Sequence, residues 1–116
     1  MVAGRSYVPE RGDIVWLDFS PHAGFEQAGR RPGLVLSPRA YNQKTGRCVV
    51  CPITSKRKGY SFEHALPDAC GIDGVVLVDH VKNQNWESRN AQYAARLASA
   101  DLDPVCDIIE ALIRPA

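Results

Sequence analysis

The sequence predicts a mainly β domain of about five short strands, followed by a single C-terminal helix. Three observations lead to this prediction. Short runs rich in β-branched and aromatic residues recur between turn signals made of Gly, Pro, Asn and Asp. The connections between these runs are too short for crossover helices, so the strands are expected to pair antiparallel. One stretch near the end of the chain repeats its apolar residues at helical spacing.

The strands are predicted in chain order from these runs. They are expected at 13–19, 33–36, 47–53, 60–66 and 75–81. The polar stretch 82–90 is ambiguous, and 93–97 fits either a short strand or a helical turn. Between the first two strands lies a long loop, 21–32, and loops of that length in compact domains are often functional.

Two helical segments are predicted. Ser37 before Pro38 places a capping hydroxyl ahead of a helical turn that ends near Gln43. The C-terminal helix carries one apolar stripe that should pack on the sheet. The stripe consists of Leu102, Val105, Cys106, Ile109, Leu112 and Ile113. Asp103 and Pro104 suit the first positions of this helix, and Ser99 offers an earlier start.

Length and charge limit the classes of function. The 116 residues are expected to form one domain over positions 1–116, long enough for a core without disulfides or a metal. The formal net charge is only +1, so any binding of nucleic acid has to come from a local basic patch. The sequence has no long apolar run and no signal-peptide pattern, which predicts a cytoplasmic protein without a membrane span.

Cys48 and Cys51 have the spacing of a zinc or redox motif. They fall within a predicted strand, however, where residues three apart point to opposite faces. No second CxxC or HxxxH motif completes a tetrahedral site, and no aspartate cluster suits Mg²⁺. We therefore expect both cysteines to be small core residues and predict neither a metal nor a cofactor.

The loop before the second strand holds Glu26, Arg30 and Arg31. Arg31 precedes Pro32, which favours an extended backbone at the start of a strand. Its guanidinium has donors that match two phosphate oxygens. Glu26 can accept a proton or hold Arg31. A surface ion pair between Glu26 and either arginine fits the same residues equally well.

A second polar segment follows the third predicted strand. The hydroxyl of Thr54 would lie at the sheet rim, where it can donate to a phosphate oxygen or to a nearby carbonyl. The basic run 56–58, with Gly59 and Tyr60 after it, can contact a nucleic-acid backbone and stack a base, or simply form a solvated hairpin tip.

The histidines offer no acid–base pair by spacing. His22, His64 and His80 lie on three different segments. His80 follows Asp79 near the end of an apolar strand, where it can read a base or serve as a half-buried structural histidine.

Taken in order, several segments resemble the MazF group of toxin ribonucleases within the wider PemK/Kid set. The matching segments cover nearly the whole chain: 7–19, 26–32, 35–38, 41–46, 52–54 and 58–63. The resemblance implies an SH3-like, partly open antiparallel β-barrel with a C-terminal helix. It also implies a homodimer that cleaves single-stranded RNA at a short motif, containing ACA in many relatives, and a MazE-like antitoxin.

The resemblance also implies roles for individual residues. Arg31 and Thr54 match the family's catalytic arginine and threonine, and Glu26 matches the acidic residue of the same loop. The predicted RNA-binding residues are Arg30, Ser55, Lys56, Lys58, Asp79, His80 and Lys82. Two of these depart from relatives: some relatives have histidine in place of Arg30, and relatives have glutamine in place of His80.

These residue types suit metal-free RNA cleavage. The resemblance implies that the ribose 2′-hydroxyl attacks the adjacent phosphorus and expels the 5′-oxygen, leaving a 2′,3′-cyclic phosphate and a 5′-hydroxyl. The reaction needs a base, an acid and donors for a dianionic centre. Arg31 and Thr54 can supply the donors and Glu26 the base. The acid stays open, because a guanidinium rarely gives up a proton in a protein.

Two other classes of function share this fold. A CcdB-type gyrase poison acts without catalysis, but that family relies on a C-terminal Trp-Gly-Ile, whereas this chain ends Ile-Arg-Pro-Ala. A non-catalytic SH3-like binding module is the third class. Cleavage of RNA in the presence of EDTA distinguishes the ribonuclease from both.

Overall fold

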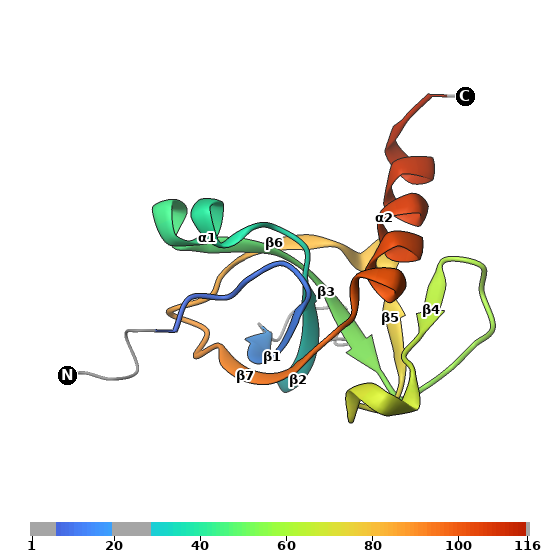
Figure 1. Cartoon of the computed structure of the whole chain (residues 1–116), viewed down its shortest axis with the longest axis horizontal. Coiled ribbons are helices and arrows are strands. Elements are labelled where there is room, and N and C mark those ends of the chain that lie inside the picture. Colours follow the sequence, from blue (N-terminus) through green and yellow to red (C-terminus); the bar gives the residue numbers. More distant parts are fainter. Residues whose placement is uncertain (1–6, 20–28, 116) are drawn as a thin grey trace.

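The computed structural model describes residues 7–19 and 29–115. In this part of the chain it contains seven strands, all paired antiparallel. They are β1 (Asp13–Phe19), β2 (Gly29–Val35), β3 (Arg47–Thr54), β4 (Glu63–Ala65), β5 (Val75–Leu77), β6 (Lys82–Asn85) and β7 (Gln92–Arg96). The helices are α1 (Arg39–Thr45) and α2 (Ser99–Ile113), and the 3₁₀ turns are η2 (Asp68–Cys70) and η3 (Val78–His80). The predicted mainly β fold with a C-terminal helix is confirmed (Figure 1).

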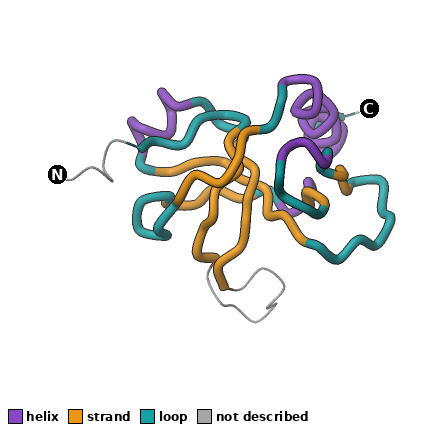
Figure 2. Tube along the Cα trace, turned by 60° about the horizontal axis from the view of Figure 1, so that its bottom comes forward, coloured by secondary structure: helices purple, strands orange, loops and turns teal. Residues whose placement is uncertain are grey.

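Strand β3 organises the sheet. The strand order is β4-β5-β3-β2-β1-β7, and β6 also pairs with β3. Residues 47–50 of β3 pair with β6, whereas its last two residues pair with β5. The chain from β5 to β6 therefore follows one edge of β3, interrupted by η3. The strands cross in the middle of the molecule and the helices lie at its periphery (Figure 2).

Apolar residues cover both faces of the sheet, so the core has two parts. One part includes Ile14, Leu34 and Cys51 and is covered by α2 through Val105. The other includes Leu17, Val50 and Cys48. The two cysteines are fully buried on opposite faces, as predicted, and burial raises the pKa of each thiol to about 12.

Helix α1 is held by a buried amide rather than by the predicted cap. Its N-cap residue, Pro38, makes no side-chain cap bond. The Ser37 hydroxyl instead donates to Asn42 Oδ1 and accepts the Val49 N–H. The Asn42 amide in turn donates to the Pro9 and Ser37 carbonyls. The predicted capping role of Ser37 is therefore wrong, because its hydroxyl is used to join α1 to β3.

Several predicted boundaries were also wrong. The sheet has two more strands than expected, because the polar stretch after η3 pairs with β3 and 92–96 pairs with β1. Strand β2 begins at Gly29 rather than at 33, since residues 29–32 pair with β1 despite the proline. Strands β4 and β5 are shorter than predicted. Helix α2 takes the earlier start, because the Ala98 carbonyl accepts the Asp101 and Leu102 N–H groups ahead of Pro104.

Candidate functional site

A cleft of about 460 Å³ lies where β3 ends, between the loop 55–62 and η3. It brings together residues that are far apart in the sequence. Its lining consists of Thr54, Lys56, Lys58, Tyr60, Phe62, Glu63, Leu77, Asp79 and His80. Thr54, Lys56, Lys58, Asp79 and His80 were all candidates from the sequence. The cleft thus has a hydroxyl and two cations on one side and an acidic–imidazole pair on the other.

Thr54 is fixed at the rim by its neighbours on both sides. Its Oγ1 accepts the N–H of Lys56 at 3.2 Å, which leaves its hydroxyl proton available for donation. Its backbone pairs with Val75, and Gly74 approaches so closely that a Cβ there would lie 2.4 Å from the Thr54 carbonyl oxygen. Gly74 also has φ of +130°. Only glycine tolerates both conditions, so Gly74 permits this position of Thr54.

Arg31 lies on the same face of the sheet as Thr54. Side chains alternate along a strand, so Arg31 shares the face of Gly33 and Val35. Val35 pairs with Val50 and Gly33 with Pro52, and the same register continued by two residues would set Arg31 opposite Thr54. Beyond Pro52, however, the pairing of β3 with β2 ends, and β3 is paired with β5 on its other edge. The arginine and the hydroxyl therefore flank the place where two neighbouring strands separate.

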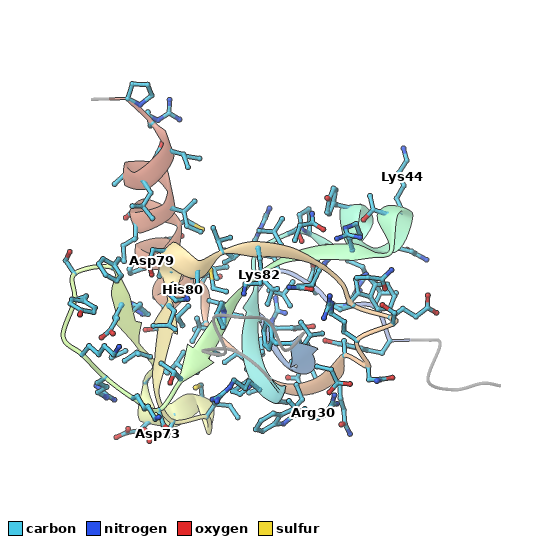
Figure 3. The ribbon with its side chains drawn as sticks, turned by 180° about the vertical axis from the view of Figure 1, so that it is seen from behind. Arg30, Lys44, Asp73, Asp79, His80 and Lys82 are labelled. Carbon is cyan, nitrogen blue, oxygen red and sulfur yellow. The ribbon has the colours of Figure 1, made fainter. Side chains whose placement is uncertain are left out.

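The segment after β5 presents three further candidates in succession. Because η3 interrupts the strand, Asp79 and His80 both reach the cleft, with Asp79 Oδ1 3.8 Å from His80 Nε2. Lys82 follows in β6, and its Nζ lies 5.5 Å from the centre of the Phe19 ring. Figure 3 shows Asp79, His80 and Lys82 along this one segment.

Four residues of the cleft were not site candidates from sequence. The sequence indicates Tyr60 only as a residue that can stack a base, and it predicts Phe62, Glu63 and Leu77 as parts of strands. The Glu63 carboxylate accepts the backbone N–H groups of Lys58 and Gly59. The signal in the sequence is Gly59 followed four residues later by Glu63, because the carboxylate can accept the N–H groups of a turn at the glycine.

Arg30 lies on the opposite face of β2 from Arg31. Its guanidinium donates to Asp18 Oδ1 at 2.9 Å, to the Asn90 carbonyl at 2.9 Å and to Gln92 Oε1 at 3.1 Å. The Asn90 amide and this guanidinium lower the pKa of Asp18. The structure does not bring Arg30 to the cleft, and Figure 3 places it apart from Asp79 and His80. Glu26 lies outside the described residues, as does His22.

A second, larger hollow is apolar. This groove, of about 950 Å³, runs between α2 and the start of α1. Its lining includes Leu36, Tyr41, Val49, Val81, Cys106, Ile109 and Ile113. Two apolar residues at the end of α2 are unusually open to solvent, Leu112 at 54% and Ile113 at 75%. The last turn of the predicted apolar stripe is thus uncovered in the single chain.

Among residues 7–19 and 29–115, no three His, Cys, Asp or Glu side chains are grouped so that they could hold a metal ion. No helix in these ranges is long and apolar enough to cross a membrane.

Comparisons with known proteins agree with one another. Residues 10–113 match the model of the PemK-like, MazF-like toxins of type II toxin–antitoxin systems. The chain is 46% identical over 107 residues to the endoribonuclease toxin MazF of Escherichia coli K12, covering 92% of this chain and 96% of that protein.

Two solved structures from Deinococcus radiodurans are also similar. MazF matches with a TM-score of 0.88 and 49% identity, covering 93% of this chain and 98% of that one. A MazE–MazF complex matches with a TM-score of 0.87 and 48% identity, over 96% of this chain and 100% of that one.

Proposed function

The chain belongs to the PemK-like, MazF-like toxins of type II toxin–antitoxin systems, and from this premise we propose that it is an endoribonuclease. It cleaves single-stranded RNA in the cytoplasm at a short motif, and residues 1–116 act as one toxin domain. The observation that supports this most is the placement of Arg31 and Thr54 on one face of the sheet, where β2 and β3 separate beside a cleft with two lysines.

The proposed chemistry assigns the reacting phosphate to this opening. Arg31 donates its N–H groups to two non-bridging oxygens and Thr54 donates its hydroxyl, so both stabilise the dianionic centre formed when the 2′-hydroxyl attacks. The products are a 2′,3′-cyclic phosphate and a 5′-hydroxyl. Glu26 is the proposed base. No metal takes part in this scheme, because side-chain donors balance the developing charge.

The remaining candidates are proposed to hold the RNA on either side of the reacting phosphate. Lys56 and Lys58 neutralise the backbone along the cleft. Ser55, next to Thr54 in the chain, donates its hydroxyl to a phosphate oxygen. Asp79 and His80 offer hydrogen-bonding groups to base edges, with Lys82 next to them. Arg30 stays a predicted RNA contact, reached from the outer face of β2.

Two protein partners belong to the proposal. The first is a MazE-like antitoxin, because a relative from Deinococcus radiodurans is found in a MazE–MazF complex. An acidic, disordered antitoxin segment would cover the basic rim near Arg31 and Lys56–Lys58. The second is another copy of the chain, for which the exposed apolar end of α2 and its groove are the supporting features.

The test is cleavage of a pool of random-sequence single-stranded RNAs, which contains every short motif, by the purified protein in EDTA. We expect fragments with cyclic phosphate and 5′-hydroxyl ends, and no cleavage of the matching pool of DNA, which lacks the attacking 2′-hydroxyl. Intact RNA under conditions that leave the protein folded would refute the proposal, as would cleavage that stops when EDTA is added. Sequencing of the cut ends identifies the motif.

A further inference from the structure

Two aromatic rings form a platform beside the cleft. Tyr60 and Phe62 are stacked, with ring centres 4.9 Å apart and planes 23° apart. Phe62 is half-buried, whereas Tyr60 keeps 52% of its surface exposed. Phe62 covers one face of the Tyr60 ring, so the exposed surface belongs to the other face and the edge. Both residues line the cleft.

The platform stands next to cations. Lys56 and Lys58 line the same cleft and lie on the loop that leads to Tyr60. An exposed ring next to lysines is the combination that holds single-stranded nucleic acid, because the cations follow the phosphates while a base stacks on the ring. A paired base has both faces covered, so such a ring takes an unpaired one.

Glu63 holds this loop in place. Its Oε1 accepts the Gly59 N–H at 3.0 Å and the Lys58 N–H at 3.2 Å, and Oε2 lies 3.3 Å from the same Lys58 nitrogen. The Glu63 N–H donates back to the Tyr60 carbonyl at 3.2 Å. Glu63 itself is in β4 and pairs with Leu77 of β5. The Glu63 side chain therefore ties the loop to β4, and Figure 1 shows this loop leading into β4.

We propose that the exposed face of Tyr60 is a stacking site for one unpaired RNA base, and that Glu63 is a positioning residue that holds this site open. The inference rests on the proposed ribonuclease function and adds a binding site to it. Stacking on a preformed ring requires little ordering at the moment of binding, so the platform adds affinity for any base at that position.

The first test measures binding without cleavage. The probe is a single-stranded RNA that spans the mapped cleavage site, with 2′-deoxyribose at the cleaved nucleotide. Tyr60→Ala is expected to weaken binding about 5- to 150-fold, the range for loss of one base stack. Tyr60→Phe keeps the ring and should bind like the wild type. Tyr93→Ala is the matched control, because Tyr93 is 51% exposed on β7, at the other end of the sheet.

A series of the same probe with one abasic nucleotide identifies the stacked base. One abasic position should weaken wild-type binding and have no further effect on Tyr60→Ala. If Tyr60→Ala binds as tightly as the wild type, or if every abasic position affects both proteins equally, the stacking site is refuted. These outcomes are separate from the proposed function, which fails only if the wild type does not cleave RNA.

The role of Glu63 is tested by kinetics. Glu63→Ala is expected to raise KM for cleavable RNA while kcat is retained, because the reacting groups are untouched. Glu63→Gln retains an oxygen that can accept the two N–H groups and should recover most of the wild-type KM. A loss of kcat with unchanged KM in folded Glu63→Ala, or no recovery in Glu63→Gln, would overturn the positioning role.

Discussion

Two adjacent arginines have different surroundings because side chains alternate across a strand. Arg31 shares the face of Gly33 and Val35, toward the place where β3 leaves β2. Arg30 lies on the other face and is bound to Asp18, Asn90 and Gln92. The sequence identifies both as candidates. They are separated because the pairing of β1 with β2 extends the strand through both residues, and pairing between distant residues is not visible in the local sequence.

The network around Arg30 predicts a dependence of stability on pH. The Asn90 amide and the Arg30 guanidinium lower the pKa of Asp18 in the folded protein. A lowered carboxyl pKa stabilises the fold above the unfolded value, about 3.9, and this contribution is lost as pH falls through the folded value. As the pH is lowered below about 4, we expect the melting temperature of the wild type to decrease. In Asp18→Asn the decrease in melting temperature with falling pH should be smaller, as measured by circular dichroism. If the variant and the wild type show the same dependence of melting temperature on pH, Asp18 does not make this contribution.

At the scale of elements, the end of β3 determines the site. Its pairing with β2 ends at Pro52 on one edge, while Ile53 and Thr54 pair with β5 on the other edge, so Thr54 lies where β3 separates from β2. The sequence predicted β3 well because its apolar run is continuous. It overestimated β4 and β5, because the loop before β4 is held by the Glu63 carboxylate and the chain after β5 turns into η3. Alternation of side chains does not reveal either interaction.

Gly74 provides the test at this scale. A Cβ there would meet the Thr54 carbonyl oxygen at 2.4 Å, and φ is +130°. Gly74→Ala is therefore expected to lower the free energy of unfolding by about 1–3 kcal/mol and to displace Thr54. Denaturant unfolding and RNA cleavage measure the two effects. Gly71→Ala is the control for a positive φ alone, since nothing lies within 4 Å of a Cβ at that position. Equal cleavage by both folded variants would contradict the role of Gly74.

At the scale of the whole molecule, the exposed apolar end of α2 supports the proposal that a second copy of the chain covers it. The apolar stripe was predicted from spacing, but the structure covers only its first part, through Val105 and its neighbours. The sequence cannot tell a stripe that packs within one chain from a stripe shared between two.

The dimer proposal is tested with two charges on one helix turn. Ile113→Asp puts a carboxylate in the apolar groove, whereas Ala111→Asp puts one on the same turn outside the groove lining. Both new carboxylates lie at the same end of the helix, so the two variants differ only in whether the charge enters the groove. We expect Ile113→Asp to shift sedimentation towards the monomer and Ala111→Asp to behave like the wild type. If both variants and the wild type sediment alike, the groove is not the dimer surface.

Much of the site could be predicted from the sequence only because several segments, taken in order, resemble the MazF group of toxins. Thr54, Lys56, Lys58, Asp79 and His80 do meet in one cleft. Composition and spacing left each of them with an ordinary structural explanation. Phe62, Glu63 and Leu77 were missed, because their positions depend on how the loop folds back on β4 rather than on any local pattern.

The most direct test of the account compares cleavage by Arg31→Ala and Thr54→Ala with that by Arg57→Ala. Arg57 is exposed between the two cleft lysines but is not part of the cleft lining, so it controls for loss of charge in the basic loop. Loss of one preorganised donor typically costs about 10²–10³ in rate, so each of the first two variants should lose at least that much while staying folded. Arg57→Ala should cleave nearly as fast as the wild type. A folded Arg31→Ala or Thr54→Ala protein with near-normal cleavage would contradict the account.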